Sequence, residues 1–392
     1  KGMAEPLLPR RPGAGRDAGR PPLGPLYCQT LLSAVAVCVS RLPALSLRFQ
    51  ELAFDAGLDT AAAAAAFGRV AAMRSVAEFV ATPAVAAWSD RVGRRKALAL
   101  SMVAFCCENA LLAGSRSLAV LSASHVLIGC LCDSSGALEH SCIADATPRE
   151  QRSVPFGRLI MVVGASMMIG PMIGGELIAR VGSAAPFAFA AALSLVSFVY
   201  MALFLPEYLP AHRRANAGPG NGARGSRAHW RELVALLGRS PGLSWYLAAT
   251  AFANAGLGAY SSTQAFWARE ALAWGARDLG RFISVTGIFV AIAQGGLLPM
   301  LQARFIGREG RLAQLCLVLN AAKVCAYGAA TDGRAVYAAT CAGAAGCCGV
   351  TVLRSLATRS VGERQQGLFS GATSAIGAAS QMLGAVSGSQ VL

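Results

Sequence analysis

The sequence predicts an all-α protein embedded in a membrane, and three observations support this prediction. The chain is 55% hydrophobic and 14% charged, with a mean hydropathy of +0.50 over 392 residues. This is more apolar surface than a soluble domain of that length carries. Its apolar residues gather into runs of about 18 or more, the length that a helix needs to cross ~30 Å of hydrocarbon. Short basic segments separate many of these runs, which is typical of loops at the cytosolic face of a membrane.

Eleven apolar runs define the predicted spans and divide the chain into two bundles. They cover residues 26–47, 61–87, 97–114, 118–143, 156–180, 184–205, 242–267, 279–301, 312–330, 335–353 and 368–390. Segments rich in Pro, Gly and Arg precede the first run and follow the sixth, and this composition is typical of disordered chain. The predicted parts are a disordered cytosolic tail, a six-helix bundle, a cytosolic linker and a second bundle with five helices, at residues 1–25, 26–205, 206–241 and 242–392.

The distribution of positive charge predicts the orientation in the membrane. With the amino terminus in the cytosol, the cytosolic segments hold 24 of the 35 Lys and Arg residues. Basic residues near helix ends resist translocation, so this asymmetry sets orientation. The net charge of +15 therefore reflects topology. We expect a multi-pass protein whose partner is the lipid bilayer, with no nucleic acid bound.

A charged segment joins the second and third runs at residues 88–96, Trp-Ser-Asp-Arg-Val-Gly-Arg-Arg-Lys. It resembles the loop between helices two and three of major facilitator transporters, whose pattern is G-x-L-x-D-R-x-G-R-R-K, with Ala86 in place of the leading glycine. The resemblance implies two pseudo-symmetric six-helix bundles. It also implies that Asp90 and Arg94 join Asp145 in a cytosolic charge cluster that latches the outward-open state. Solvated anchoring charges are the alternative.

The fifth run carries a pattern of small residues around a proline. Small residues four apart let another helix approach closely, and a proline inside a helix removes one hydrogen bond and bends it. The spacing G-x8-G-x3-G-P-x2-G-G resembles the signature of proton-coupled antiporters in this superfamily, with serine at the second glycine. Ordinary small-residue packing is the alternative. The pattern consists of Gly157, Ser166, Gly170, Pro171, Gly174 and Gly175.

Other segments extend the resemblance over almost the whole chain. Residues 302–311 repeat the basic character of the 88–96 loop at the matching place in the second half, as expected for a duplicated fold with a substrate site between the halves. Residues 144–157, 206–210 and 365–371 resemble the drug:proton antiporter branch, and within it the hippocampus abundant transcript-like and tetracycline-efflux-like proteins. Because the family has a twelfth helix, the eleven runs predict that this helix is missing.

Ionisable residues inside the runs are the candidates for coupling and for the cavity. An ionised side chain at a helix centre costs roughly 2.5–3.5 kcal/mol, so each needs a partner, water or neutralisation. Arg74 and Glu78 lie one turn apart on one face, and form either a gate or an intrahelical ion pair. Asp133, with no cation one turn away, is the predicted proton carrier, or else a hydrogen-bonded polar site. Glu108 is expected to make only a local polar contact.

In the fourth run, a histidine stands where members of the resembled family often have an arginine. Family members often have an arginine, four residues before a glycine, that is tied to proton coupling. Here His125 precedes Gly129 by four. Because histidine titrates near physiological pH, it can serve in coupling directly. A packing role for His125 is the alternative.

The leading functional interpretation is a secondary active transporter of a small organic solute. Rocking of its two bundles would expose the substrate site to one side of the membrane and then to the other, which is alternating access. Proton-coupled antiport or efflux is expected, with the proton gradient as energy source, no cofactor and a monomeric chain. A transporter-fold receptor or trafficking partner that no longer transports is the alternative. An enzyme is disfavoured, because no catalytic grouping or phosphate loop is evident. The twelve cysteines include no Cys-x-x-Cys pair, so no metal site is expected.

Overall fold

The computed structural model describes residues 21–148, 153–209, 241–359 and 366–388. Most of the predicted tail and most of the predicted linker lie outside these ranges. Within them, every regular element is a helix. The predicted all-α class is therefore confirmed.

The helices of the first half run from α1 to α8. Each of the first six apolar runs falls on one helix or on consecutive helices. Their bounds are α1 (Gly24–Val39), η1 (Ser40–Ala44), α2 (Leu45–Asp55), α3 (Thr60–Val92), α4 (Arg94–Gly114), α5 (Leu118–Leu127), α6 (Gly129–Ala146), α7 (Ser153–Val181) and α8 (Ala185–Phe204).

The helices of the second half run from α11 to α17, and the remaining five apolar runs coincide with them. Their bounds are α11 (Pro241–Leu272), α12 (Ala276–Ile292), η3 (Ala293–Leu297), α13 (Leu298–Arg304), α14 (Glu309–Ala329), α15 (Gly333–Ala342), η4 (Ala344–Cys347), α16 (Cys348–Arg359) and α17 (Gln366–Gly388).

Several predicted spans are interrupted helices, and the interruptions fall at residues that weaken helical hydrogen bonding. Pro43 lies in η1, the π-helical turn between α1 and α2, where its ring removes a backbone donor. Gly129 begins α6 directly after α5 ends, and glycine is among the poorest helix formers. The segments 333–342 and 344–353 are bent by 58°, with Gly343 between them.

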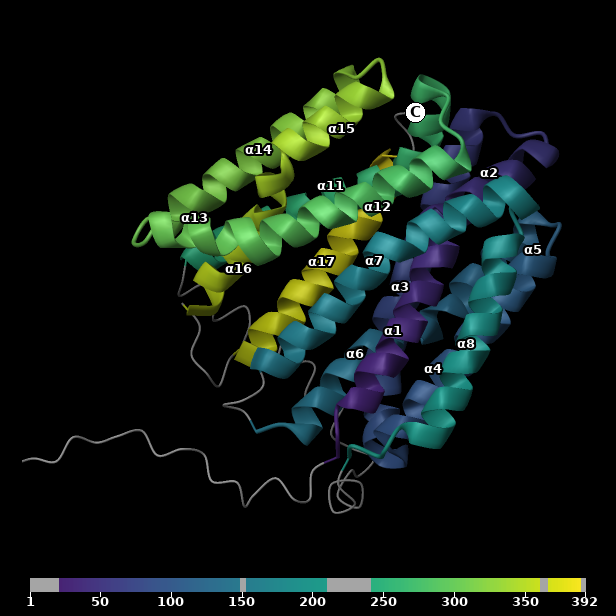
Figure 1. Cartoon of the computed structure of the whole chain (residues 1–392), viewed down its shortest axis with the longest axis horizontal. Helices are drawn as coiled ribbons and strands as arrows, with labels where there is room; N and C mark the ends of the chain where they lie inside the picture. The colour runs from purple at the N-terminus through teal and green to yellow at the C-terminus, as the bar shows by residue number, and fades with distance from the viewer. Residues whose placement is uncertain (1–20, 149–152, 210–240, 360–365, 389–392) are drawn as a thin grey trace, which may run out of the picture.

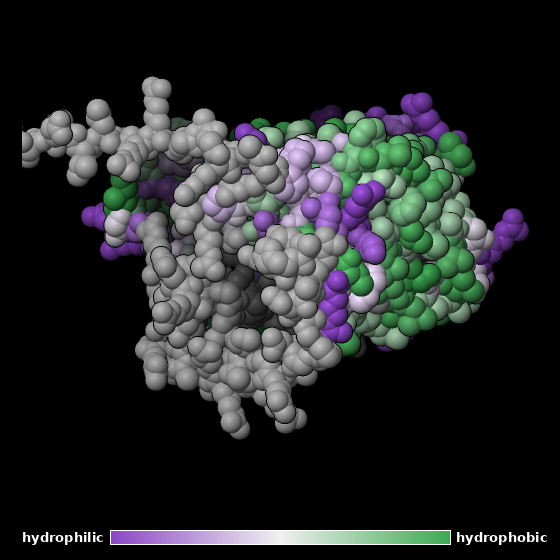
Figure 2. Space-filling view, turned by 90° about the horizontal axis from the view of Figure 1, so that it is seen from below, coloured by the Kyte–Doolittle hydropathy of each residue, from purple (hydrophilic) through white to green (hydrophobic). Residues whose placement is uncertain are grey.

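Among the described residues, seven helices are long and apolar enough to cross a membrane, or eight if the bent pair counts as one span. Large apolar side chains on their outer surfaces are exposed, such as Phe252 (80%) and Leu203 (71%). Figure 2 shows apolar side chains covering one flank of the molecule. Outward-facing apolar helices with satisfied backbone groups are what a bilayer requires. The chain is therefore an integral, multi-pass membrane protein by composition and by structure.

The two halves meet along α7 with α12 and along α3 with α17. We call the end with the Gly57, Gly182 and Ala273 turns the far end, and the end with Gly93 and residues 206–209 the near end. From the far end, the helices of the first half run toward the bottom of Figure 1, whereas α12, α14 and α15 of the second half extend toward the left.

Candidate functional site

A cluster of charged side chains from four helical segments lies inside the first half. Glu108 on α4 is at its centre, with 1% of its side chain exposed. Its Oε2 atom lies 3.2 Å from Arg41 Nη2, and its Oε1 atom lies 3.1 Å from Arg74 Nη1 and 2.8 Å from His125 Nδ1. Segments η1, α3, α4 and α5 each contribute one residue. We call these four residues the buried charge cluster.

Further contacts fix the arginines in this cluster. The Arg74 Nη1 atom donates to the His125 carbonyl oxygen at 2.8 Å and lies 2.9 Å from His125 Nδ1. The Arg41 guanidinium stands over the Phe105 ring, 5.3 Å from its centroid, a cation–π contact. With His125 neutral, two guanidinium groups and one carboxylate leave the cluster with a net charge of +1. Such a group inside a membrane is costly, which makes the cluster a candidate functional site.

The structure brings together some predicted site residues and not others. Arg74 and His125 meet in the cluster, whereas Glu78 lies one turn further along α3 and is half-buried. Asp133 belongs to α6, but its side chain lies outside the described residues. The prediction that Glu108 makes only a local contact is wrong, because its partners come from three other segments. Arg41 was missed, although a buried acid that must find a cation was the available signal.

The three residues of the predicted latch lie together at the near end. Arg94 Nε is 3.0 Å from Asp145 Oδ2, and Arg94 Nη2 is 2.6 Å from Asp90 Oδ1. The Arg94 guanidinium also donates to the Ser89 hydroxyl. The two acids differ in burial, since 8% of the Asp145 side chain is exposed against 51% for Asp90. Asp145 is therefore the stronger partner.

Glu207 joins the same corner from the start of the predicted linker. Its carboxylate accepts hydrogen bonds from the backbone N–H groups of Arg94, at 2.9 Å, and Arg95, at 3.3 Å. Anions are favoured at a helix N-terminus, here that of α4. Gly93 has φ of 106°, and a Cβ atom there would collide with the Glu207 carboxylate. The Tyr208 hydroxyl donates to the Pro22 carbonyl at 2.9 Å, so this part of the linker packs on the bundle.

Unequal burial of the two acids predicts unequal effects of their neutralisation. We expect Asp145→Asn to lower the free energy of unfolding by about 1.5–3 kcal/mol, the usual contribution of a hydrogen bond to a charged group. Asp90→Asn removes an exposed pair one turn apart, so its effect is expected to stay below about 0.5 kcal/mol. Thermal unfolding of the purified variants in nanodiscs measures both. Equal shifts for the two variants would contradict this ranking.

The glycines of the α7 pattern mark places where backbones come close. A Cβ atom on Gly174 would lie 2.6 Å from the Val39 carbonyl oxygen of α1, and one on Gly175 would lie 2.6 Å from the Ala276 carbonyl oxygen of α12. Gly170 is equally tight against Cys38. In contrast, a Cβ on Gly157 would meet nothing within 4 Å. The pattern thus packs α7 against its own half and against the other half at once.

The two other predicted members of this pattern also lie in the α7 interior. Ser166 is fully buried, and its hydroxyl donates to the Val162 carbonyl at 3.0 Å. Pro171 is buried within α7, and its carbonyl oxygen lies where a Cβ of Gly280 on α12 would be. Glycine on α12 therefore matches the small residues of α7 across the interface.

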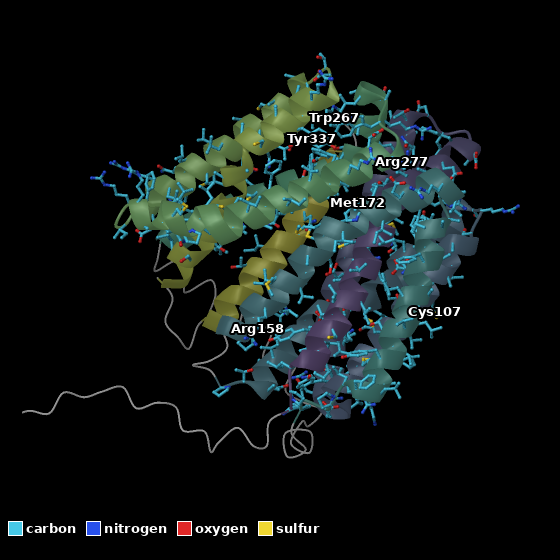
Figure 3. The ribbon with its side chains drawn as sticks, viewed as in Figure 1. Cys107, Arg158, Met172, Trp267, Arg277 and Tyr337 are labelled. Carbon is cyan, nitrogen blue, oxygen red and sulfur yellow. The ribbon has the colours of Figure 1, made fainter. Side chains whose placement is uncertain are left out.

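Polar contacts join the halves at the far end. The Glu176 carboxylate on α7 lies 2.9 Å from Arg277 Nε and 3.7 Å from Arg281 Nη2, both on α12. Figure 3 shows Arg277 on α12 near the stretch of α7 that carries Met172. The Arg269 Nη1 atom on α11 donates to the Gln50 side-chain oxygen on α2 at 3.1 Å. These contacts close the far end between the two halves.

Known proteins resemble this chain over most of its length. The family model of the Major Facilitator Superfamily matches residues 32–385. The chain belongs to the major facilitator superfamily. Tetracycline resistance protein, class E, of Escherichia coli is 26% identical over 284 residues, which are 69% of this chain and 62% of that protein. Solute carrier family 67 member A1 of Homo sapiens is 25% identical over 74% of this chain and 70% of its own length.

Solved structures show the same fold. The human organic anion transporter MFSD10 (TETRAN) superposes with a TM-score of 0.60 at 20% identity, covering 93% of this chain and 94% of its own. A peptide transporter POT bound to alafosfalin gives a TM-score of 0.70 at 13% identity, covering 92% and 87%. At such identities the likeness concerns the fold alone. The predicted major facilitator fold is thereby confirmed.

Proposed function

We propose that this chain is a secondary active transporter that moves a small organic solute by alternating access and exchanges it for protons. Membership of the superfamily supports secondary transport. The observation that carries the proposal is the buried charge cluster, because charged side chains inside a membrane are retained at ion and substrate pathways. We place the amino terminus in the cytosol and the chain in the bilayer as a monomer.

The contacts between the halves support a rocking mechanism. With the near end in the cytosol, the far end, where contacts join the two halves, is the outer end. Glu176 with Arg277 and Gln50 with Arg269 make these contacts. In the outward-facing state these contacts separate, and the near end closes instead. Rocking of one bundle against the other about a central site is the usual form of alternating access.

The contact between His125 and Glu108 is a second candidate for proton coupling, beside Asp133. A nitrogen and an oxygen 2.8 Å apart need a proton between them, since two lone pairs at this distance repel. His125 Nδ1 also lies 2.9 Å from Arg74 Nη1, and one nitrogen cannot accept from Arg74 while it donates to Glu108. Gain or loss of this proton therefore decides which partner His125 holds. Movement of Arg74 would transmit that change to α3, which packs on α17 of the other half.

The proposal also assigns roles to two other acidic residues, Asp133 and Glu78. Asp133, on the helix that follows His125, remains the proton carrier that the sequence predicts. Glu78 with Arg74 remains the predicted gate or substrate contact. The two assignments of the proton carrier predict different effects of substitution, because His125 would act through Glu108 and Arg74 whereas Asp133 would act through its own carboxyl group.

Flux into reconstituted vesicles separates these assignments. We use tetracycline as the first probe and impose a pH gradient across liposomes that contain the full chain. Asp133→Asn is expected to abolish proton-driven accumulation while tetracycline binding persists, with a fall of about 10²-fold in accumulation rate, the lower bound for loss of a proton-transfer group. His125→Asn is the matched variant on the neighbouring helix.

Each outcome of this assay has a definite meaning. If Asp133→Asn accumulates the probe with unchanged pH dependence and His125→Asn does not, His125 is the carrier and the Asp133 assignment is wrong. If neither variant differs from the parent chain, the coupling proposal fails. Probe binding without any flux in the parent chain would favour the alternative function, a receptor on a transporter fold.

A further inference from the structure

A second site lies beside the buried charge cluster, in a cavity of about 350 Å³ between α1, α4, α6 and α7. Val37, Met102, Phe105 and Met167 make much of its wall apolar. Volumes of this order, with apolar walls and a few convergent polar groups, are typical of small-molecule sites. Glu139 on α6 is the one carboxyl group among the described residues that line it.

Glu139 is unusual because its charge has no described counterpart. The residue is 5% exposed, and none of the ion pairs among the described residues involves it. Its closest polar association is with Thr30 on α1, whose hydroxyl is buried and makes no hydrogen bond with a described residue. A buried carboxylate without a cation is costly. The cavity thus holds a carboxyl group that no described ion pair involves and a hydroxyl group with no hydrogen-bond partner among the described residues.

Arg41 makes one end of the cavity more positive than the end that holds Glu139. Arg41 stands over the Phe105 ring, and Phe105 is part of the cavity wall. Arg41 and Thr30 are separated by about 16 Å along the helical segment, at 1.5 Å per residue. A positive charge in the cavity is therefore repelled from the Arg41 end and attracted to Glu139.

We propose that this cavity binds a small amphipathic amine, whose ammonium group donates hydrogen bonds to Glu139 and Thr30 while its apolar body lies against Phe105 and the methionine side chains. Thioether sulfur and aromatic rings make favourable contacts with apolar and aromatic groups of varied shape. The proposal rests on the proposed function and names the chemical class of its solute.

Binding to the purified full chain in nanodiscs tests this proposal. The probes are 4-phenylbutylamine and its uncharged isostere 4-phenylbutan-1-ol, each titrated by calorimetry at neutral pH. The parent chain is expected to bind the amine about tenfold more tightly than the alcohol, as loss of a charge-assisted hydrogen bond implies. In Glu139→Gln the amine is expected to lose about tenfold in affinity, while the alcohol changes by less than about threefold.

A control variant separates this site from the general charge of the protein. Glu51 pairs with Arg48 near the far end, and 48% of its side chain is exposed. Glu51→Gln removes the same charge away from the cavity, so amine affinity is expected to stay at the parent value. Retained alcohol binding by Glu139→Gln shows that this variant is folded, and Glu139→Asp is expected to recover part of the preference for the amine.

Equal affinity of the amine for the parent chain and for Glu139→Gln would overturn the proposal. If Glu139→Gln also loses pH-dependent flux, Glu139 is a proton carrier and not an amine site. Failure of the proposed function is distinguishable from both, because a chain that binds the amine at Glu139 but drives no flux keeps the site and loses the transporter assignment.

Discussion

Replacing Glu108 by Gln is expected to lower the free energy of unfolding by about 3–5 kcal/mol, the usual cost of breaking a buried ion pair from one side. The carboxylate is shared by Arg41, Arg74 and His125, at 3.2, 3.1 and 2.8 Å. Without it, Arg41 and Arg74 both lose the ion pair that they make with this carboxylate inside the first half. Thermal or denaturant unfolding in lipid nanodiscs measures the loss.

A second substitution distinguishes electrostatics from packing at this position. In the Glu108→Gln background, Arg74→Gln removes one of the two buried positive charges that Glu108 contacts, so the double variant is expected to be more stable than Glu108→Gln alone. The matched control is Glu51→Gln, whose exposed pair with Arg48 contributes below about 1 kcal/mol. A loss for Glu108→Gln no larger than that for Glu51→Gln would show that the cluster does not stabilise the bundle.

The helices were predictable because the requirement for apolar length is local. Each apolar run needs enough consecutive residues to cross the hydrocarbon, and this property is visible in the sequence without any knowledge of neighbours. The breaks were harder to place. Pro43 and Gly343 lie inside predicted runs, but prolines and glycines are common in membrane helices that stay continuous, because neighbouring groups satisfy the freed backbone.

The candidate site was predictable only in part, because it depends on which helices become neighbours. Arg74 and His125 were singled out by the cost of a charge inside a membrane, and both belong to the buried charge cluster. The bond between Arg74 and Glu108 joins residues 34 apart in sequence, and that of Arg41 with Glu108 joins residues 67 apart. Spacing along one helix indicates only Glu78 as a neighbour of Arg74, whereas the contact with Glu108 depends on the packing of α3 against α4.

The near-end cluster shows the opposite case. Its residues lie near the ends of α3, α4 and α6, and the resemblance of the 88–96 segment to a known pattern predicts that they lie together. Arg94 with Asp145 and Asp90 was placed correctly. Glu207 belongs to the 206–210 segment, which carries part of the resemblance, but the sequence does not indicate its contact. Its carboxylate caps the start of α4, and this contact requires the chain after α8 to lie beside Gly93.

Gly175→Ala is expected to shift the chain toward a state that is open at the far end. The added methyl group would lie 2.6 Å from the Ala276 carbonyl oxygen on α12, and a backbone atom cannot move aside as the tip of a side chain can. Overpacking of this kind costs about 1–3 kcal/mol, and here it is incurred only while α7 and α12 are in contact. The equilibrium between closed and open far ends is therefore expected to move by about 5- to 150-fold.

Two glycines of the same pattern supply the controls. Gly174→Ala meets the Val39 carbonyl within the first half, so it is expected to reduce stability without favouring either state. Gly157→Ala has open space around its added methyl and is expected to change neither property. Distances between spin labels at the exposed positions Asp55 and Ala271, in a cysteine-depleted chain, report the far-end opening. A longer distance in Gly175→Ala alone supports the rocking mechanism, because only that glycine lies against the other half. The same lengthening in Gly174→Ala would instead mean that α7 packing within its own half sets the opening.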